Sequence, residues 1–239
     1  MSLPQIIRIP ILPFGMVNCH LITGKNGCIL VDAGLPGSES KIERVLKRYQ
    51  LSFQDIKLIV VTHAHVDHAG SAAHLRELSG APIVGHEGDA EYYSQKKMMT
   101  FCSTGWFGRL FLRTGLIFQP YTPFRPDVLL SNDEILNLER FGFPGVVRHS
   151  PGHTAGSISV QLTTMDVMVG DLIASGILLG GIARTKHAMR PPFEDDPQIV
   201  AIELQRLIDS GMQRFYMGHG GPLNVDEVKF HVKNLRNLI

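Results

Sequence analysis

The sequence has 239 residues, of which 44% are hydrophobic and 19% charged, a composition typical of a folded globular protein. Its 23 lysines and arginines nearly balance its 22 aspartates and glutamates, and the formal net charge of +1 disfavours a nucleic-acid or membrane partner. No apolar run reaches the roughly 18 residues of a membrane span, and the first ten residues lack the pattern of a signal peptide. We therefore expect one cytoplasmic domain spanning residues 1–239.

Apolar periodicity predicts strands with helices interspersed. Short apolar runs bounded by Gly or Pro are typical of strands, and apolar residues at i, i+3, i+4 and i+7 are typical of amphipathic helices. The first three strands are expected to form a β-meander, and Ser38 is placed to cap the helix after them. In chain order, strands are expected at 6–11, 20–23, 28–31, 58–61, 82–84, 146–149, 157–161, 167–169 and 215–217, and helices at 38–49, 71–78 and 197–208.

The densest set of potential metal ligands follows the expected strand at 58–61. His63, His65, Asp67 and His68 form an H-x-H-x-D-H pattern on the loop between this strand and the next helix. Imidazole and carboxylate groups at such density are ligands that zinc-type ions select. The segment therefore predicts a metal site.

Three more donors lie just beyond expected strands, each beside glycine. They are His153, Asp171 and His219. Each alone would be an ordinary turn residue, but together with the first cluster they give seven donors, enough for two adjacent ions. The other histidines are expected to be structural, and the three cysteines, which lack a C-x-x-C pattern, to be buried thiols: His20, His74, His86, His149, His187, His231, and Cys19, Cys28, Cys102.

These motifs, taken together, resemble those of the metallo-β-lactamase-fold hydrolases. The series comprises Thr62-His63-Ala64-His65-Val66-Asp67-His68-Ala69-Gly70, then Pro151-Gly152-His153-Thr154, Gly170-Asp171 and Gly218-His219-Gly220. The resemblance implies an α+β fold, a four-layer αβ/βα sandwich with metals along one edge. Asp32 matches an acidic residue that supports the ligand loop in this family.

The resemblance also implies how the donors divide between two divalent ions. It gives His63, His65 and His153 to the first ion, gives Asp67, His68 and His219 to the second, and makes Asp171 the bridging carboxylate. Zinc is the expected ion, with iron and manganese as alternatives. A hydroxide bridging the metals would be the nucleophile, and Asp67 would be the catalytic residue that orients it or takes its proton.

The family's branches differ in the bond they cut. Asp171 stands where one branch of true β-lactamases has cysteine, and the pattern is more similar to hydroxyacylglutathione hydrolases, N-acyl homoserine lactonases, ribonuclease Z and phosphodiesterases. Only 20 residues follow His219, which disfavours the helical extension that binds glutathione. We expect cleavage of an ester-type bond, in a lactone, thioester or carboxyl ester, of a small molecule. The alternatives are a phosphodiesterase, a β-lactamase, an iron-dependent redox enzyme similar to persulfide dioxygenases, and a non-catalytic binding module.

An apolar insertion is expected around residues 91–124. It is rich in aromatic residues and methionine and holds few acids. Its side chains could pack helices onto the sandwich, cover a substrate with an apolar moiety, or form the face of a homodimer. A second loop, at 172–193, carries Arg184, Lys186, His187 and Arg190 and could meet an anionic substrate group or be a solvated basic loop.

Overall fold

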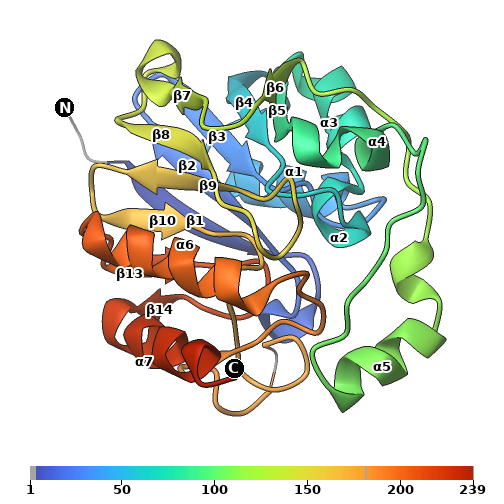
Figure 1. Cartoon of the computed structure of the whole chain (residues 1–239). Coiled ribbons are helices and arrows are strands. Elements are labelled where there is room, and N and C mark those ends of the chain that lie inside the picture. Colours follow the sequence, from blue (N-terminus) through green and yellow to red (C-terminus); the bar gives the residue numbers. More distant parts are fainter. Residues whose placement is uncertain (1–3, 181, 239) are drawn as a thin grey trace.

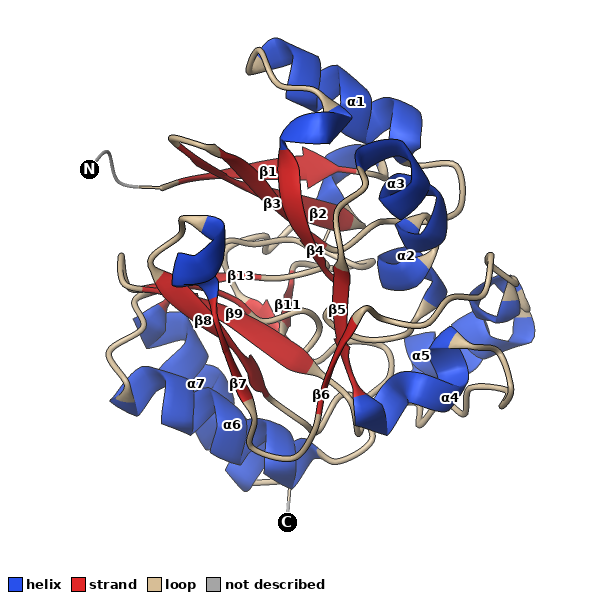
Figure 2. Cartoon of the chain, turned by 90° about the horizontal axis from the view of Figure 1, so that it is seen from above, coloured by secondary structure: helices blue, strands red, loops and turns tan. Residues whose placement is uncertain are grey.

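Two six-stranded β-sheets pack face to face between two outer layers of helices (Figures 1 and 2). The computed structural model describes residues 4–180 and 182–238. This arrangement confirms the predicted α+β sandwich. Its helices lie on the outer face of each sheet, α1 to α3 on one side and α6 and α7 on the other.

The first sheet comes from the N-terminal half of the chain. Its strands follow chain order, with antiparallel pairs from β1 to β3 and parallel pairs from β3 to β6. The antiparallel pairs confirm the predicted meander. The strands are β1 (Gln5–Pro10), β2 (Asn18–Gly24), β3 (Gly27–Val31), β4 (Ile56–Val60), β5 (Ile83–His86) and β6 (Val128–Leu130).

The second sheet has the order β14-β13-β10-β9-β8-β7, in which only β10 and β13 pair in parallel. A separate short hairpin joins β11 and β12. The strands are β7 (Ile135–Asn137), β8 (Gly145–His149), β9 (Ile158–Leu162), β10 (Asp166–Met168), β11 (Ala174–Ser175), β12 (Ala188–Met189), β13 (Arg214–Tyr216) and β14 (Leu223–Asn224).

Helices connect these strands, and α1 to α3, α6 and α7 cover the outer faces of the sheets. The α-helices are α1 (Glu39–Arg48), α2 (Val66–Ala69), α3 (Ala72–Ser79), α4 (Ala90–Tyr93), α5 (Trp106–Arg113), α6 (Pro197–Asp209) and α7 (Val225–Arg236). The short 3-10 helices are η1 (Pro13–Gly15), η2 (Phe53–Asp55), η3 (Glu87–Asp89), η4 (Leu116–Phe118) and η5 (Leu138–Phe141). No helix in the described part of the chain is long and apolar enough to cross a membrane.

The alternation of side chains along each strand builds three apolar layers. In β3, Cys28 and Leu30 join the core beneath the helices of the first sheet, whereas Ile29 and Val31 join the core between the sheets. In β10, Val167 faces α6 and α7 and Met168 faces the first sheet. Successive strand residues point to opposite faces, so a strand buried on both faces must be apolar throughout. The unbroken apolar run of β3 is explained in this way.

The structure differs from the expected elements in several places. Asp67 and His68 lie in the short helix α2 rather than in a loop, and β6, β7, β14 and α7 were not predicted. Ser38 makes no side-chain cap to α1, because its backbone is already helical, with φ −77° and ψ −8°, instead of extended. The prediction of three buried thiols is right for Cys19 and Cys28 but wrong for Cys102, which is exposed in the loop before α5.

Candidate metal centre

The first group of ligand side chains lies where β4 ends. His63 and His65 follow β4, and Asp67 and His68 lie a few residues further on, in α2. The backbone changes from extended at His65 to helical at Val66, and the His68 ring still lies 4.0 Å, between ring centroids, from the His63 ring. One short segment thus supplies side chains to two neighbouring positions.

The remaining donors reach the same place from the second sheet. His153 lies in the loop between β8 and β9, Asp171 follows β10, and His219 follows β13. A methyl group at Gly218 would overlap the His68 ring and the Asp171 carboxylate, so this close approach requires glycine. All seven predicted donors therefore gather at one edge of the sandwich.

The seven side chains form two groups that could each hold a metal ion, with the ligand atoms of each group within 4.8 Å of one another. In the first, His153 Nε2 lies 3.2 Å from His63 Nε2 and 3.2 Å from His65 Nδ1. In the second, His219 Nε2 lies 3.4 Å from Asp67 Oδ2. These groups are His63, His65, His153 and Asp171, and Asp67, His68 and His219.

Asp171 lies between the two groups. Its Oδ2 atom is 3.8 Å from His153 Nε2 and 2.9 Å from His219 Nε2, and its Oδ1 atom is 3.5 Å from His68 Nε2. The carboxylate therefore has contacts on both sides, as a group shared by two cations would.

Unpaired polar atoms in this cluster fit a bound cation. His68 Nε2 and Asp171 Oδ1 are buried without a hydrogen-bond partner, and the ring nitrogens of His153 and His63 face each other. Buried polar groups normally find partners, and neutral imidazole nitrogens that face each other gain most from a cation between them. The residues present therefore fit divalent metal ions.

Burial and neighbouring charges shift the pKa values in both directions, so that His63 and His153 are neutral at pH 7, whereas His219 carries a proton that a metal ion would displace. Burial lowers the pKa of His153 to about 4 and also lowers that of His63, so both imidazoles are neutral at pH 7. Burial opposes ionisation of Asp171, but the neighbouring His219 and His68 outweigh it and hold its pKa well below the usual value. Burial also lowers the pKa of His219, yet the Asp171 carboxylate outweighs it and raises that pKa to about 9.

Asp32 and Met16 orient two of the imidazoles from behind. Asp32 Oδ2 lies 2.9 Å from His68 Nδ1, and Asp32 Oδ1 accepts a hydrogen bond of 2.8 Å from the backbone N–H of Thr62. The backbone carbonyl of Met16 accepts from His219 Nδ1. Because each Nδ1 donates, the Nε2 atoms remain free to bind metal. Asp32 thus supports the ligand loop as the resemblance implies.

Asp89, which was not predicted from the sequence, joins two ligand loops. This buried carboxylate accepts hydrogen bonds from the backbone N–H of Ala64 at 2.9 Å, from Thr154 Oγ1 at 3.0 Å and from the backbone N–H of Gly156 at 3.0 Å. Burial outweighs these bonds and raises its pKa to about 6. Its place just after β5, the parallel neighbour of β4, was the available signal, because parallel strands end at the same edge.

Comparison with known proteins agrees with this geometry. Residues 12–219 match the family model described as Metallo-beta-lactamase superfamily. This chain belongs to the metallo-beta-lactamase superfamily. That membership and the donor cluster identify it as a metal-dependent hydrolase, and the fold implies divalent metal ions.

Several superfamily members resemble the chain along most of its length. Hydroxyacylglutathione hydrolase GloC of Haemophilus influenzae is 29% identical over 92% of this chain and 93% of that protein, and the probable metallo-hydrolase YqgX of Bacillus subtilis is 28% identical over 74% of each. Among solved structures, the BLEG-1 B3 metallo-beta-lactamase has a TM-score of 0.70 at 22% identity, covering 97% of this chain and 99% of that one. At this identity the structural likeness shows the fold alone.

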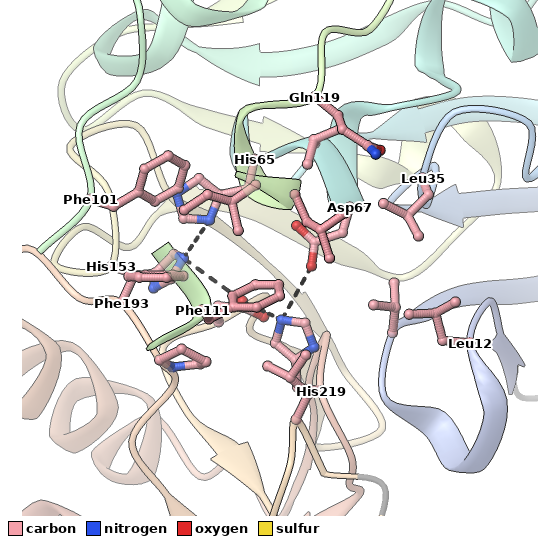
Figure 3. Close-up of a pocket in the computed structure, with 17 residues that line it drawn as sticks. Leu12, Leu35, His65, Asp67, Phe101, Phe111, Gln119, His153, Phe193 and His219 are labelled. Carbon is pink, nitrogen blue, oxygen red and sulfur yellow. Dashed lines mark hydrogen bonds and ion pairs between the residues drawn. The ribbon is translucent and has the colours of Figure 1, made fainter. Parts of the chain in front are cut away.

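In this superfamily member an apolar cavity of about 360 Å³ opens beside the donor cluster (Figure 3). Phe101, Phe111 and Phe193 surround it, and Phe101 packs against the His65 ring at a centroid distance of 4.9 Å. Gln119 is the one polar residue among the described lining residues that does not belong to the cluster. The cavity is lined by Leu12, Val17, Leu35, His65, Val66, Asp67, Phe101, Phe111, Leu116, Ile117, Gln119, His153, Asp171, Leu179, Pro192, Phe193 and His219.

The expected insertion takes part in this cavity. Phe101, Phe111, Leu116 and Ile117 come from it and line the cavity. In contrast, the basic residues of the 172–193 loop are not among the described lining residues. The six histidines outside the predicted donor set also lie outside both donor groups.

Proposed function

We propose that the protein is a dinuclear metallohydrolase that cleaves an ester-type bond of a small molecule with an apolar moiety. In this proposal His63, His65 and His153 hold one ion, and Asp67, His68 and His219 hold the other. The observation that carries it is the placement of Asp171, whose carboxylate contacts both groups. Sites rich in imidazole suit zinc, with iron and manganese as alternatives.

Two divalent ions bound at such a site lower the pKa of a coordinated water from 15.7 toward roughly 7 and polarise the bond to be cut. The chain's own residues then orient the reactants and move protons. The Asp67 side chain is 22% exposed and lines the cavity, whereas the Asp171 side chain is only 3% exposed. Asp67 is therefore the carboxylate best placed to take a proton at Oδ2.

The cavity supports a neutral, apolar substrate group beside the scissile bond. No lysine or arginine occurs among its described lining residues, so a phosphate or carboxylate there would lack a positive partner from the protein. Burial of an acyl chain is favoured by about 0.8 kcal/mol per methylene. Lactones, thioesters and carboxyl esters with an acyl chain fit these requirements better than phosphodiesters do.

A relative of known name also supports thioesters among the proposed substrates. The relative GloC is named a hydroxyacylglutathione hydrolase, and the aligned region spans 93% of that protein. The short segment after His219 is therefore no argument against a thioester substrate. The apolar cavity favours the acyl side of such a substrate over its charged side.

Proton release in a pH-stat tests the proposal. Metal-depleted and zinc-reconstituted protein would be given lactones, thioesters and carboxyl esters with short and medium acyl chains. We expect acid release that depends on zinc, increases with acyl length, and is lost in Asp67→Ala but kept in Asp226→Ala, a matched change on the exposed surface of α7. Zinc-independent release, or none from any ester while a phosphodiester or β-lactam is cut, would contradict the proposed bond.

A further inference from the structure

Helix α5 carries an exposed stripe of alternating apolar and basic residues. Trp106, Arg109, Leu110 and Arg113 recur at i, i+3, i+4 and i+7, so they share one face of the helix. All four are exposed, Trp106 by 70% and Leu110 by 52% of their surface. We call these four residues the α5 stripe. Figure 1 shows α5 at the periphery of the molecule, outside both sheets.

The opposite face of α5 packs inward. Phe111 lines the cavity and lies 6.1 Å, between ring centroids, from Phe193, and Phe107 stacks on Phe111 at 6.1 Å. The helix thus has an apolar face toward the cavity and a second, mixed face toward solvent. Contiguous exposed apolar patches often mark binding surfaces, and the α5 stripe brings Trp106 and Leu110 together on one face of the helix.

The segment around the stripe carries charge of one sign. Residues 92–126 contain five lysines and arginines, including Arg109 and Arg113, and no aspartate or glutamate. Because the whole chain has a formal charge of only +1, the remaining residues are net acidic. The near-zero total therefore conceals a local excess of positive charge in this segment, which suits a negatively charged partner.

Exposed apolar side chains also occur in segments that line the cavity. Leu116 lines the cavity and is nevertheless 51% exposed. Leu178 is exposed next to Leu179, which lines the cavity, and Phe14 is exposed two residues beyond Leu12, which also lines it. Exposed apolar side chains thus come from three of the segments that form the cavity.

We propose that the α5 stripe and the exposed apolar side chains of the cavity-lining segments dock on the surface of an anionic phospholipid bilayer. Tryptophan and leucine between arginines suit this interface, because the rings and alkyl groups enter the head-group region while the cations pair with lipid phosphates. An amphiphilic ligand could then pass from the bilayer into the cavity without crossing water. This proposal departs from the expectation drawn from net charge, which averages over the whole chain.

A second copy of the chain is a less suitable partner. In a symmetric dimer formed through the α5 stripe, the same patch faces itself, so Arg109 and Arg113 would lie near their own copies. Like charges brought together at an interface oppose association. A lipid surface offers negative charge and apolar depth together, which matches both kinds of residue in the stripe.

The chain contains a direct probe of this docking, because Trp106 is its single tryptophan. Emission from the full chain would be recorded with vesicles of phosphatidylcholine alone and with vesicles of equal parts phosphatidylcholine and phosphatidylglycerol. We expect a blue shift with the anionic vesicles that weakens as salt is added, and little shift with phosphatidylcholine. No shift and no co-sedimentation with anionic vesicles at low salt would overturn the proposal.

Variants distinguish docking through the α5 stripe from nonspecific adsorption to lipid. Changing Arg109→Gln and Arg113→Gln together is expected to lower the partition coefficient about thirtyfold, the equivalent of about 1 kcal/mol for each charge. Phe230→Ala removes an equally exposed aromatic ring from α7, 61% exposed, and should leave binding unchanged. If the blue shift instead occurs without vesicles and increases with protein concentration, and sedimentation shows a dimer, lipid docking would be wrong. The α5 stripe would then bind a second copy of the chain.

Discussion

Replacement of Asp89 by asparagine tests whether this carboxylate couples the two loops that carry His63, His65 and His153. Asparagine keeps the size of the side chain but turns one acceptor oxygen into an NH2 group. That group would face the backbone N–H of either Gly156 or Ala64. The change therefore removes part of the hydrogen bonding that joins the two loops, without creating a cavity.

Two opposing terms set the effect of this change on global stability. A buried N–H left without a partner costs about 1–3 kcal/mol. Burial raises the pKa of Asp89 from 3.8 to about 6, so the folded protein holds a proton that the unfolded chain releases, and stability falls as pH rises between those values. At neutral pH the ionised carboxylate thus costs about 3 kcal/mol, which asparagine avoids. The terms nearly cancel.

No opposing term offsets the loss of metal affinity. Residues that orient metal ligands typically raise metal affinity by 10–100-fold. We predict that Asp89→Asn weakens zinc binding by about 10–100-fold while the unfolding free energy of the metal-free protein changes by no more than about 2 kcal/mol. Competition with a chromogenic chelator measures the first quantity and urea unfolding the second. Asp133→Asn, the same change on an exposed side chain, is the control. Unchanged zinc affinity in Asp89→Asn would refute the coupling.

Three further changes probe the ligand edge, the cavity and the core. Gly218→Ala should cost most of the zinc affinity, because its methyl group overlaps the His68 ring, whereas Gly105→Ala, which has open space, should not; metal analysis after dialysis compares them. Phe111→Ala should lower kcat/KM for a medium-chain ester about tenfold, since contact with a partly buried ring contributes about 1.5 kcal/mol to binding of the acyl chain. Hydrolysis of a short acetyl ester should change little. Equal losses of kcat/KM for both esters would contradict an acyl-binding role. Burial, assisted by the charge of a nearby arginine, lowers the pKa of His231 to about 4. The stability that comes from keeping this imidazole neutral is therefore complete above pH 6.5 and falls by up to about 3 kcal/mol as pH falls toward 4. Urea unfolding from pH 7 to pH 4 should show a smaller fall in unfolding free energy for His231→Leu than for the unchanged protein.

The donor set was predictable because each member follows a strand that the apolar pattern reveals. The runs before His63, Asp171 and His219 are short and continuous, and strand ends converge where a sandwich places its loops. The structure places all seven predicted side chains in one cluster. Their roles as metal ligands, and the identity and number of the ions, stay predictions.

Other features depend on tertiary contacts that no local pattern contains. Asp89 belongs to no motif of the chain, and its role arises from bonds to residues 25 and 67 positions away. Ser38 fits a capping pattern, yet packing near Ser71 holds its backbone helical and its N–H bonded to that hydroxyl. Residues 91–124 are visibly apolar in the sequence, but only the structure shows which face of α5 lines the cavity.

Zinc would be restored stepwise to chelator-treated protein while hydrolysis of a medium-chain ester is followed. We expect activity to be lost on chelation, to return in proportion to added zinc, and to saturate at two ions per chain. Activity that survives chelation, or that one ion per chain restores in full, would contradict a dinuclear metallohydrolase.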